Sequence, residues 1–210
     1  AYETHIAFHD AATHLHTAEQ EARARAIQAS YDAGERERDS ARFRELAIRD
    51  ALTGLYNRRF IDTQMTALTA QSVANRTALS VAIVDADFFK HINDECSHDV
   101  GDRVLQAMAS ILDGAVVTPE TVGRLGGEEF VLLLPGIAAD AAFERCEQMR
   151  RLIQDHDWSS LVGDLAVTVS VGMSTAANGQ TSAAAILSDA DRNLYAAKRS
   201  GRNRVMADTR

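Results

Sequence analysis

The chain has 210 residues, of which 46% are hydrophobic and 25% are charged, and its formal net charge is −8. This length and composition allow one core of ordinary size, with residues left over for an extension. The negative charge argues against a nucleic-acid binder that relies on a broad basic surface, and no apolar run reaches the roughly 18 residues that span a bilayer. The two cysteines lack a metal-binding spacing, so we expect a reducing, cytoplasmic location.

The N-terminal segment, residues 1–48, has the composition of a long exposed helix, with no proline and with Gly34 as its single glycine. Apolar or small residues recur at steps of seven, as in Phe8, Leu15 and Ala22. Charged residues interrupt the middle of this pattern. A solvated single helix and an imperfect dimeric coiled coil both stay open as interpretations. Because the chain begins with Ala1 rather than Met, we expect it to be part of a longer protein.

From residue 49 to residue 210, helical and strand patterns alternate, which predicts one α+β domain. Leu79–Val84 and Phe130–Leu134 are short apolar runs typical of buried strands. Helical patterns follow in the second half of the segment 88–114 and in 140–156 and 182–201, with further strands in 165–175 and near Val205. The pair Gly126-Gly127 predicts a hairpin whose tip carries two adjacent glutamates.

Acidic residues stand at the ends of the two predicted buried strands. If these strands are antiparallel neighbours, the end of one meets the start of the other, and the acids gather at one edge of the sheet. The acids are Asp85, Asp87, Glu128 and Glu129. Hard oxygen ligands without histidine or cysteine suit Mg²⁺ or Mn²⁺. Because successive strand side chains point to opposite faces, Glu128 and Glu129 are not expected to play the same part.

Groups suited to a nucleotide lie close to these acids in the sequence or at a helix end. Backbone N–H groups of the turn after the first strand, together with Lys90, suit phosphate oxygens. Lys198 and Arg202 end the last long helix, where cations suit the helix dipole and a triphosphate. Asn93 and Asp102 offer an amide and a carboxylate, and a carboxylate can accept from N1–H and the exocyclic amine of guanine. These parts indicate a nucleoside triphosphate with a metal, although the chain has no GxxxxGK[ST] motif.

Each of these motifs also has a purely structural interpretation. Taken alone, "GGEE" is more often a turn with surface acids, Asp85 and Asp87 a strand-end cap, and Lys198 with Arg202 a solvated helix end. Their joint occurrence at strand and helix ends favours a functional site.

Five blocks of the sequence resemble the signature blocks of the GGDEF family, the diguanylate cyclases, in the family's order and over residues 49–207. The blocks are "DALTGLYNRR" (50–59), "DADFFKHINDECSHDVGDRVL" (85–105), "GRLGGEEF" (123–130), "VTVSVGMS" (167–174) and "ADRNLYAAKRSGRNRV" (190–205). The resemblance implies a nucleotide-cyclase-like palm, in which helices flank a central, mainly antiparallel five-stranded sheet, here preceded by the long N-terminal helix. It also implies that two GTP molecules are joined into cyclic di-GMP with release of two pyrophosphates.

The same resemblance implies a role for each matching residue. Asp85 and Glu128 would hold Mg²⁺ (or Mn²⁺), with the backbone carbonyl of Ala86 as a further ligand. Glu128 would also help to deprotonate the ribose 3′-hydroxyl, and Glu129 is a less certain second residue of the catalytic and metal set. The substrate-binding residues would be the phosphate-binding turn, the guanine-recognising pair and the triphosphate contacts: Phe88, Phe89, Lys90, Asn93, Asp102, Lys198 and Arg202.

The resemblance also has consequences for assembly and regulation. Each domain of the family holds one GTP, so catalysis would need a homodimer, and the signalling segment 1–48 would pair two catalytic domains, 49–210, under an upstream sensor. Many members carry an inhibitory product site, RxxD, where this chain has Val117–Glu120 without the arginine, so we expect no such site. "CSH" at 96–98 replaces the usual aromatic-Gly-His. The alternative is an inactive sensor of GTP or a cyclic dinucleotide that regulates a partner.

Overall fold

The computed structural model describes residues 45–177 and 182–208. The chain divides into two units, Ala1–Ala47 and Ile48–Arg210. Residues 45–48 are helical, whereas the rest of the predicted N-terminal helix and coiled coil lies outside the described residues. Among the residues that are described, no helix is long and apolar enough to cross a membrane.

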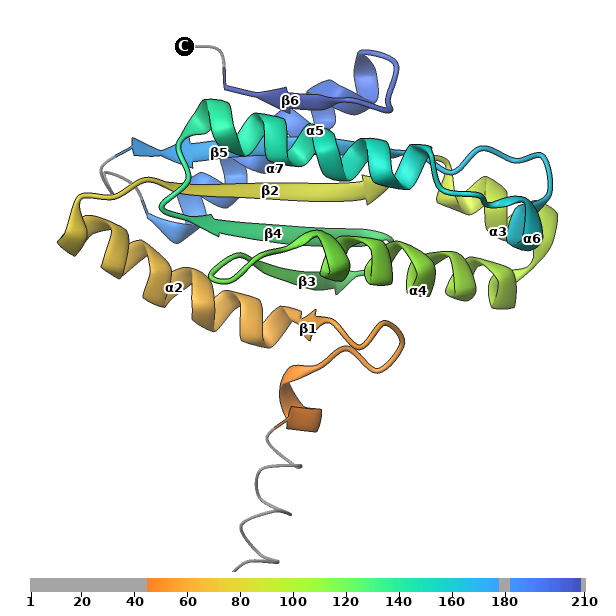
Figure 1. The fold of residues 1–210 in the computed structure, drawn as a ribbon, viewed down its shortest axis with the longest axis horizontal. Helices are drawn as coiled ribbons and strands as arrows, with labels where there is room; N and C mark the ends of the chain where they lie inside the picture. Colours follow the sequence, from red (N-terminus) through yellow and green to blue (C-terminus); the bar gives the residue numbers. More distant parts are fainter. Residues whose placement is uncertain (1–44, 178–181, 209–210) are drawn as a thin grey trace, which may run out of the picture. The chain divides into compact units, whose positions relative to one another are not determined.

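The second unit is built on a six-stranded sheet with the order β1-β3-β4-β2-β5-β6 (Figure 1). The central pairs β3/β4, β4/β2 and β2/β5 are antiparallel, and the edge pairs β1/β3 and β5/β6 are parallel. The strands are β1 (Tyr56–Asn57), β2 (Leu79–Ala86), β3 (Thr121–Gly126), β4 (Glu129–Pro135), β5 (Val169–Ala176) and β6 (Val205–Ala207). The mainly antiparallel α+β fold is therefore confirmed. The expected strand count of five is one too low, because β1 has only two residues and leaves no alternating pattern in the sequence.

Helices cover both faces of this sheet. They are α2 (Arg58–Asn75), α3 (Phe89–Cys96), α4 (His98–Ala115), α5 (Ala139–Gln154), α6 (Ser159–Val162) and α7 (Ala183–Arg199). The apolar residues of α4 and α5 pack with Val84 and Phe130 on one face, the face seen in front in Figure 1. Those of α2 and α7 pack with Val81 and Val131 on the other face. Apolar side chains on both faces therefore enclose the central strands, which accounts for the burial of every residue of β2.

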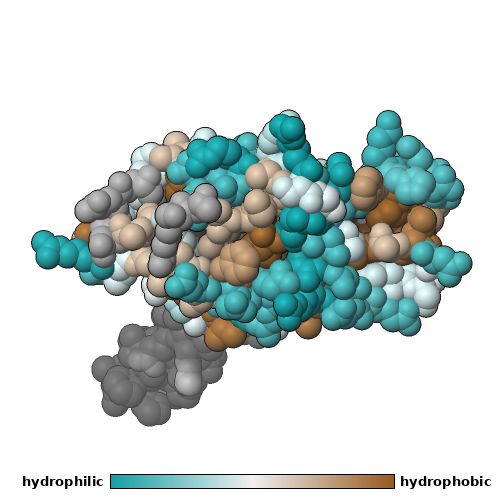
Figure 2. Space-filling view, turned by 90° about the horizontal axis from the view of Figure 1, so that it is seen from above, coloured by the Kyte–Doolittle hydropathy of each residue, from teal (hydrophilic) through white to brown (hydrophobic). Residues whose placement is uncertain are grey.

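Local sequence signals set the helix boundaries and the distance of α7 from the sheet. The Asn57 side chain accepts from the Phe60 N–H at the start of α2, and Ser182 does the same for Ala185 at the start of α7. A Cβ on Gly172 of β5 would overlap the backbone of Leu194 in α7. The glycine therefore lets α7 lie directly against β5, and the helix ends beside the end of β2. The view in Figure 2 shows hydrophilic residues over much of the surface, with smaller hydrophobic areas between them.

Candidate active site

The β3–β4 hairpin has the tip that its glycines predict. Gly126 and Gly127 have φ of 140° and 54°, values that side chains rarely allow, and a bulge lies between Arg124 and Gly126. The Arg124 guanidinium donates to the Gly127 carbonyl from Nε at 3.1 Å and from Nη2 at 2.7 Å. It also donates to Asp50 Oδ1 at 3.0 Å. The tip that carries Glu128 is thus attached to the chain segment that precedes the first strand.

The predicted antiparallel pairing of the two acid-bearing strands is confirmed. Asp85 at the end of β2 lies opposite Glu129 at the start of β4, and the Ala86 N–H donates to the Glu128 carbonyl at 3.3 Å. Asp85 is 4% exposed, and burial, opposed by Lys198, raises its pKa. Burial is also the largest cause that raises the pKa of Glu128, and repulsion from Asp85 and Glu129 adds to it. The three carboxylates therefore form a crowded, partly desolvated acidic edge.

A lysine from the end of α7 reaches this acidic edge. Lys198 Nζ lies 2.7 Å from Asp85 Oδ2, and the Lys198 ammonium counteracts the rise in pKa of both Asp85 and Glu128. Within the described parts of the chain, no three His, Cys, Asp or Glu side chains form a cluster that could hold a metal. Mg²⁺ is commonly bound by one or two carboxylates together with substrate phosphates. Asp85 and Glu128, crowded and carboxylate-only, fit that kind of site.

Asp87 has a different part from the one that the sequence indicates. Its buried carboxylate accepts from Thr168 Oγ1 at 2.8 Å and from Ser170 Oγ at 2.6 Å. It also accepts from the Asn203 N–H at 3.0 Å. Asp87 therefore joins the end of β2 to β5 and to the loop after α7, and three of the roughly four acceptor sites of its carboxylate are engaged in these bonds. Asp87 is thus a structural anchor, and its charge also contributes to the raised pKa of the neighbouring Asp85.

The predicted phosphate-binding turn divides into three different side-chain environments. Phe88 has φ 54° and ψ 29° at the start of α3 and is 63% exposed. The Arg202 guanidinium lies over its ring, 4.4 Å from the centroid. Phe89 is buried in the core, whereas Lys90 is exposed. Any contact of Phe89 with a substrate would therefore come from its backbone.

The two residues predicted to recognise guanine lie on neighbouring helices. Asn93 is on α3 and the exposed Asp102 is on α4. A Cβ on Gly101 would overlap the Asn93 amide, so this amide packs against the residue that precedes Asp102. Ser97 joins the two helices with φ 113° and ψ 161°. The missing glycine of the "CSH" segment is thus replaced by a serine in a backbone conformation that favours glycine.

The segment Val117–Glu120, which lacks the inhibitory arginine, is engaged in contacts within the domain. Glu120 accepts from Arg145 Nη2 at 2.8 Å and from the Val117 N–H at 2.9 Å. Arg145 also donates to the Ala115 carbonyl. The only carboxylate of Val117–Glu120 is therefore already paired within the domain.

Several contacts that hold the site together were not predicted from the sequence. Arg124 and Asp50 fix the hairpin tip, and Asp87 and Asn203 fix the loop that carries Arg202. The only sequence signal for them is their presence in the blocks that resemble the GGDEF signatures. Their partners are far apart in the chain, so spacing alone does not reveal the pairs.

Comparison with known proteins agrees with this architecture. The family model "Diguanylate cyclase, GGDEF domain" matches residues 47–204. The response regulator PleD of Caulobacter vibrioides is 38% identical over 164 residues, which cover 77% of this chain and 36% of that protein. A diguanylate cyclase of Vibrio cholerae is 36% identical over 76% of this chain and 49% of its own length. The chain thus spans half or less of the length of these two curated relatives.

Solved structures resemble this one over a larger share of their own chains. The coiled coil and GGDEF domain of DgcB from Caulobacter crescentus, in complex with c-di-GMP, matches with a TM-score of 0.82 and 30% identity. The match covers 88% of this chain and 98% of that one. The active GGEEF domain of a diguanylate cyclase from Vibrio cholerae matches with a TM-score of 0.69 and 33% identity, over 74% and 99% of the two chains. With its acidic hairpin tip opposite Asp85, this chain belongs to the GGDEF family.

Proposed function

We propose that the chain is a diguanylate cyclase that joins two GTP molecules into cyclic di-GMP and releases two pyrophosphates. The observation that carries the proposal is the meeting of Asp85, Glu128 and Lys198, where β2 ends beside the hairpin tip. Relatives named as diguanylate cyclases support it, as does the match to a structure described as an active GGEEF domain.

The crowded carboxylates suit both a metal ion and a proton acceptor. Asp85 and Glu128, with the Ala86 carbonyl, would hold Mg²⁺ or Mn²⁺, which polarises the phosphoryl group when bound. Glu128 accepts the proton of the ribose 3′-hydroxyl, a role suited to a carboxylate that lies within reach of the bound substrate. Glu129, across from Asp85, adds negative charge to the same edge, which strengthens both functions.

The reaction needs one bond formed and one broken for each GTP. The 3′-oxygen of one nucleotide attacks the α-phosphorus of the other, and the bond from that phosphorus to the β-phosphate oxygen breaks. Lys198 and Arg202 hold the negative charge of the leaving pyrophosphate. Because the same step occurs twice, with the two nucleotides in exchanged roles, two domains must face each other, and the active form is a homodimer.

Nucleotide selection and phosphate binding come from α3 and α4. Asn93 and Asp102 recognise guanine, with the Asp102 carboxylate accepting from N1–H and the exocyclic amine. The turn 88–90 binds phosphate through backbone N–H groups and the exposed Lys90. The domain 49–210 is the catalytic part, and residues 1–48 connect it to an upstream sensor. A cytoplasmic location stays a prediction.

We also propose that cyclic di-GMP does not inhibit this domain through the segment Val117–Glu120. The segment has no arginine, and its one carboxylate pairs with Arg145. Initial rates measured at increasing concentrations of cyclic di-GMP are expected to show only competitive inhibition with respect to GTP. Strong noncompetitive inhibition that Glu120→Ala abolishes would contradict the proposal for this segment.

The experiment that tests the activity is incubation with GTP and Mg²⁺ at high protein concentration, followed by chromatography for cyclic di-GMP. The wild type is expected to form product, and Glu128→Gln is expected to lose turnover while its thermal unfolding stays close to wild type. Bound GTP without product would instead support the inactive sensor. Normal turnover by Glu128→Gln would overturn the role given to that carboxylate.

A further inference from the structure

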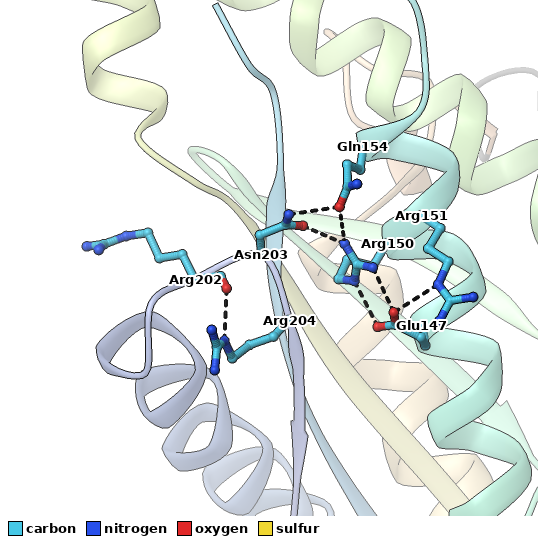
Figure 3. A network of polar contacts seen from close by, with 7 residues as sticks. All are labelled: Glu147, Arg150, Arg151, Gln154, Arg202, Asn203 and Arg204. Atoms are coloured by element: carbon cyan, nitrogen blue, oxygen red, sulfur yellow. Dashed lines mark hydrogen bonds and ion pairs between the residues drawn. The ribbon is translucent and has the colours of Figure 1, made fainter.

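A polar network joins α5 to the loop that carries Arg202 (Figure 3). Arg150 of α5 is 8% exposed, and its Nη1 donates to Asn203 Oδ1 at 2.6 Å and to Gln154 Oε1 at 2.5 Å. Asn203 Nδ2 donates to the same Gln154 oxygen at 2.8 Å. Three side chains therefore close a ring of hydrogen bonds between elements that are about 50 residues apart in the chain.

The buried guanidinium of Arg150 is held in place by an acid on its own helix. Glu147 accepts from Arg150 Nε at 2.8 Å and from Nη2 at 2.7 Å, a bidentate pair. Arg151 donates to the same carboxylate at 3.0 Å but is 66% exposed. Glu147 thus compensates the buried charge and fixes the plane of the guanidinium, which leaves Nη1 directed at Asn203.

The backbone of the loop is held at the same residue. The Asn203 N–H donates to the buried Asp87, and Arg202 and Asn203 have φ of 62° and 46°. Two consecutive non-glycine residues in the left-handed region persist only where surrounding contacts fix them. At Asn203 those contacts come from two sides, the side chain bound to α5 and the backbone bound to the end of β2.

The fixed loop directs Arg202 toward the candidate site. The Arg202 guanidinium lies on the ring of Phe88, 4.4 Å from its centroid, and Phe88 is three residues after Asp85 at the end of β2. The side chains of Arg150 and Asn203 touch none of Asp85, Glu128 and Glu129 in any described contact. Their effect on that edge must pass through the position of Arg202.

We propose that Arg150 and Asn203 are positioning residues, which hold residues 202–203 in the left-handed conformation and so place Arg202 against the triphosphate. This inference rests on the proposed function, because it takes the triphosphate of GTP as the ligand of Arg202. It predicts that the two residues set the preference for a triphosphate over a monophosphate, whereas a purely structural role would affect both ligands equally.

The test compares two nucleotides by equilibrium titration in the presence of Mg²⁺. The first is 3′-deoxy-GTP, which lacks the attacking hydroxyl and cannot turn over, and the second is GMP, which lacks the pyrophosphate. Asn203→Gly keeps the left-handed conformation accessible but removes both side-chain bonds. We expect it to bind 3′-deoxy-GTP about tenfold more weakly, with GMP binding unchanged, because a misplaced cation no longer meets the leaving phosphates.

Three further variants separate positioning from folding. Arg150→Lys keeps the charge but cannot bridge Glu147, Gln154 and Asn203 at once, so it is expected to show the same selective loss. Asn203→Asp keeps an acceptor for Arg150 and is expected to retain most of the triphosphate preference. Arg151→Ala is the matched control, because it also binds Glu147, and it is expected to change neither affinity. Circular dichroism melts show whether each variant is folded.

Two results would overturn the inference. One is that Asn203→Gly and Arg150→Lys bind both nucleotides as tightly as the wild type, and the other is that both variants lose affinity for the two nucleotides by the same factor. Turnover of GTP by the wild type separates these results from a failure of the proposed function. A wild type that forms cyclic di-GMP, with unchanged selectivity in the variants, refutes only the positioning role, whereas a wild type that forms none refutes the activity first.

Discussion

Replacement of Ser97 by glycine is expected to stabilise the domain, because Ser97 has a backbone conformation that is almost restricted to glycine. With φ 113° and ψ 161°, the residue lies in a region that costs a side chain about 1–3 kcal/mol. Its hydroxyl caps α4 through the Val100 N–H, but at 3.4 Å this bond is long, and a change from serine to glycine at a cap costs only a few tenths of a kcal/mol. The extra freedom of glycine in the unfolded chain costs about 0.4–1 kcal/mol.

The net gain for Ser97→Gly is therefore roughly 1 kcal/mol, which corresponds to a rise in Tm of about 2–4 °C for a domain of this size. Urea denaturation of wild type, Ser97→Gly and Ser97→Ala measures it. Alanine loses the hydroxyl and keeps the strain, so it is expected to be slightly less stable than wild type. If glycine destabilises as much as alanine does, the backbone at this turn is unstrained and the reasoning is wrong.

Three other predictions concern the contacts around the site. Hydrogen bonding from Arg150 is the largest cause that lowers the pKa of Glu147. Glu147→Gln is therefore expected to lower the free energy of unfolding by about 2 kcal/mol at pH 7, less than the roughly 3–5 kcal/mol lost when a fully buried ion pair is broken. Because the pKa of Glu147 in the folded state lies below its ordinary value of 4.5, the stability difference between wild type and Glu147→Gln is fully present above pH 4.5 and shrinks as the pH falls. Urea denaturation of both proteins at several pH values measures it. Arg124→Ala releases the hairpin tip and is expected to lower kcat for GTP at least tenfold, roughly the effect of a misplaced catalytic group. Arg124→Lys is expected to recover part of this loss. A kcat of Arg124→Ala equal to that of the wild type would contradict the prediction. Asp102→Asn is expected to reduce the preference for GTP over ATP in binding titrations by about tenfold or more, and an unchanged preference would place guanine recognition elsewhere.

The two central strands and the hairpin could be predicted from the sequence because their signals are local. The apolar runs after Leu79 and after Glu129, with the glycine pair between β3 and β4, determine which segments pair and which acids stand at their ends. Helix α2 and strand β1 have no such signal and were not predicted. Helix α2 is mostly polar and buries only Ile61, Met65 and Ser72, and β1 is two residues long.

Only the tertiary structure decided the role of each residue at the site. Asp85 and Asp87 are two residues apart at the end of one strand, yet Asp85 contacts Lys198, whereas Asp87 accepts hydrogen bonds from Thr168, Ser170 and Asn203. Phe88 and Phe89 are adjacent, yet one is exposed and the other is in the core.

The physical reason is that a side chain's role depends on its burial and on partners that are distant in the sequence. The Asp50–Arg124 bond joins residues 74 positions apart, and the Arg150–Asn203 bond joins residues 53 positions apart. The sequence by itself determined the family, the central strands and the residue types of the site. The packing of α5, α7 and the hairpin against the sheet determined which of those residues contact one another.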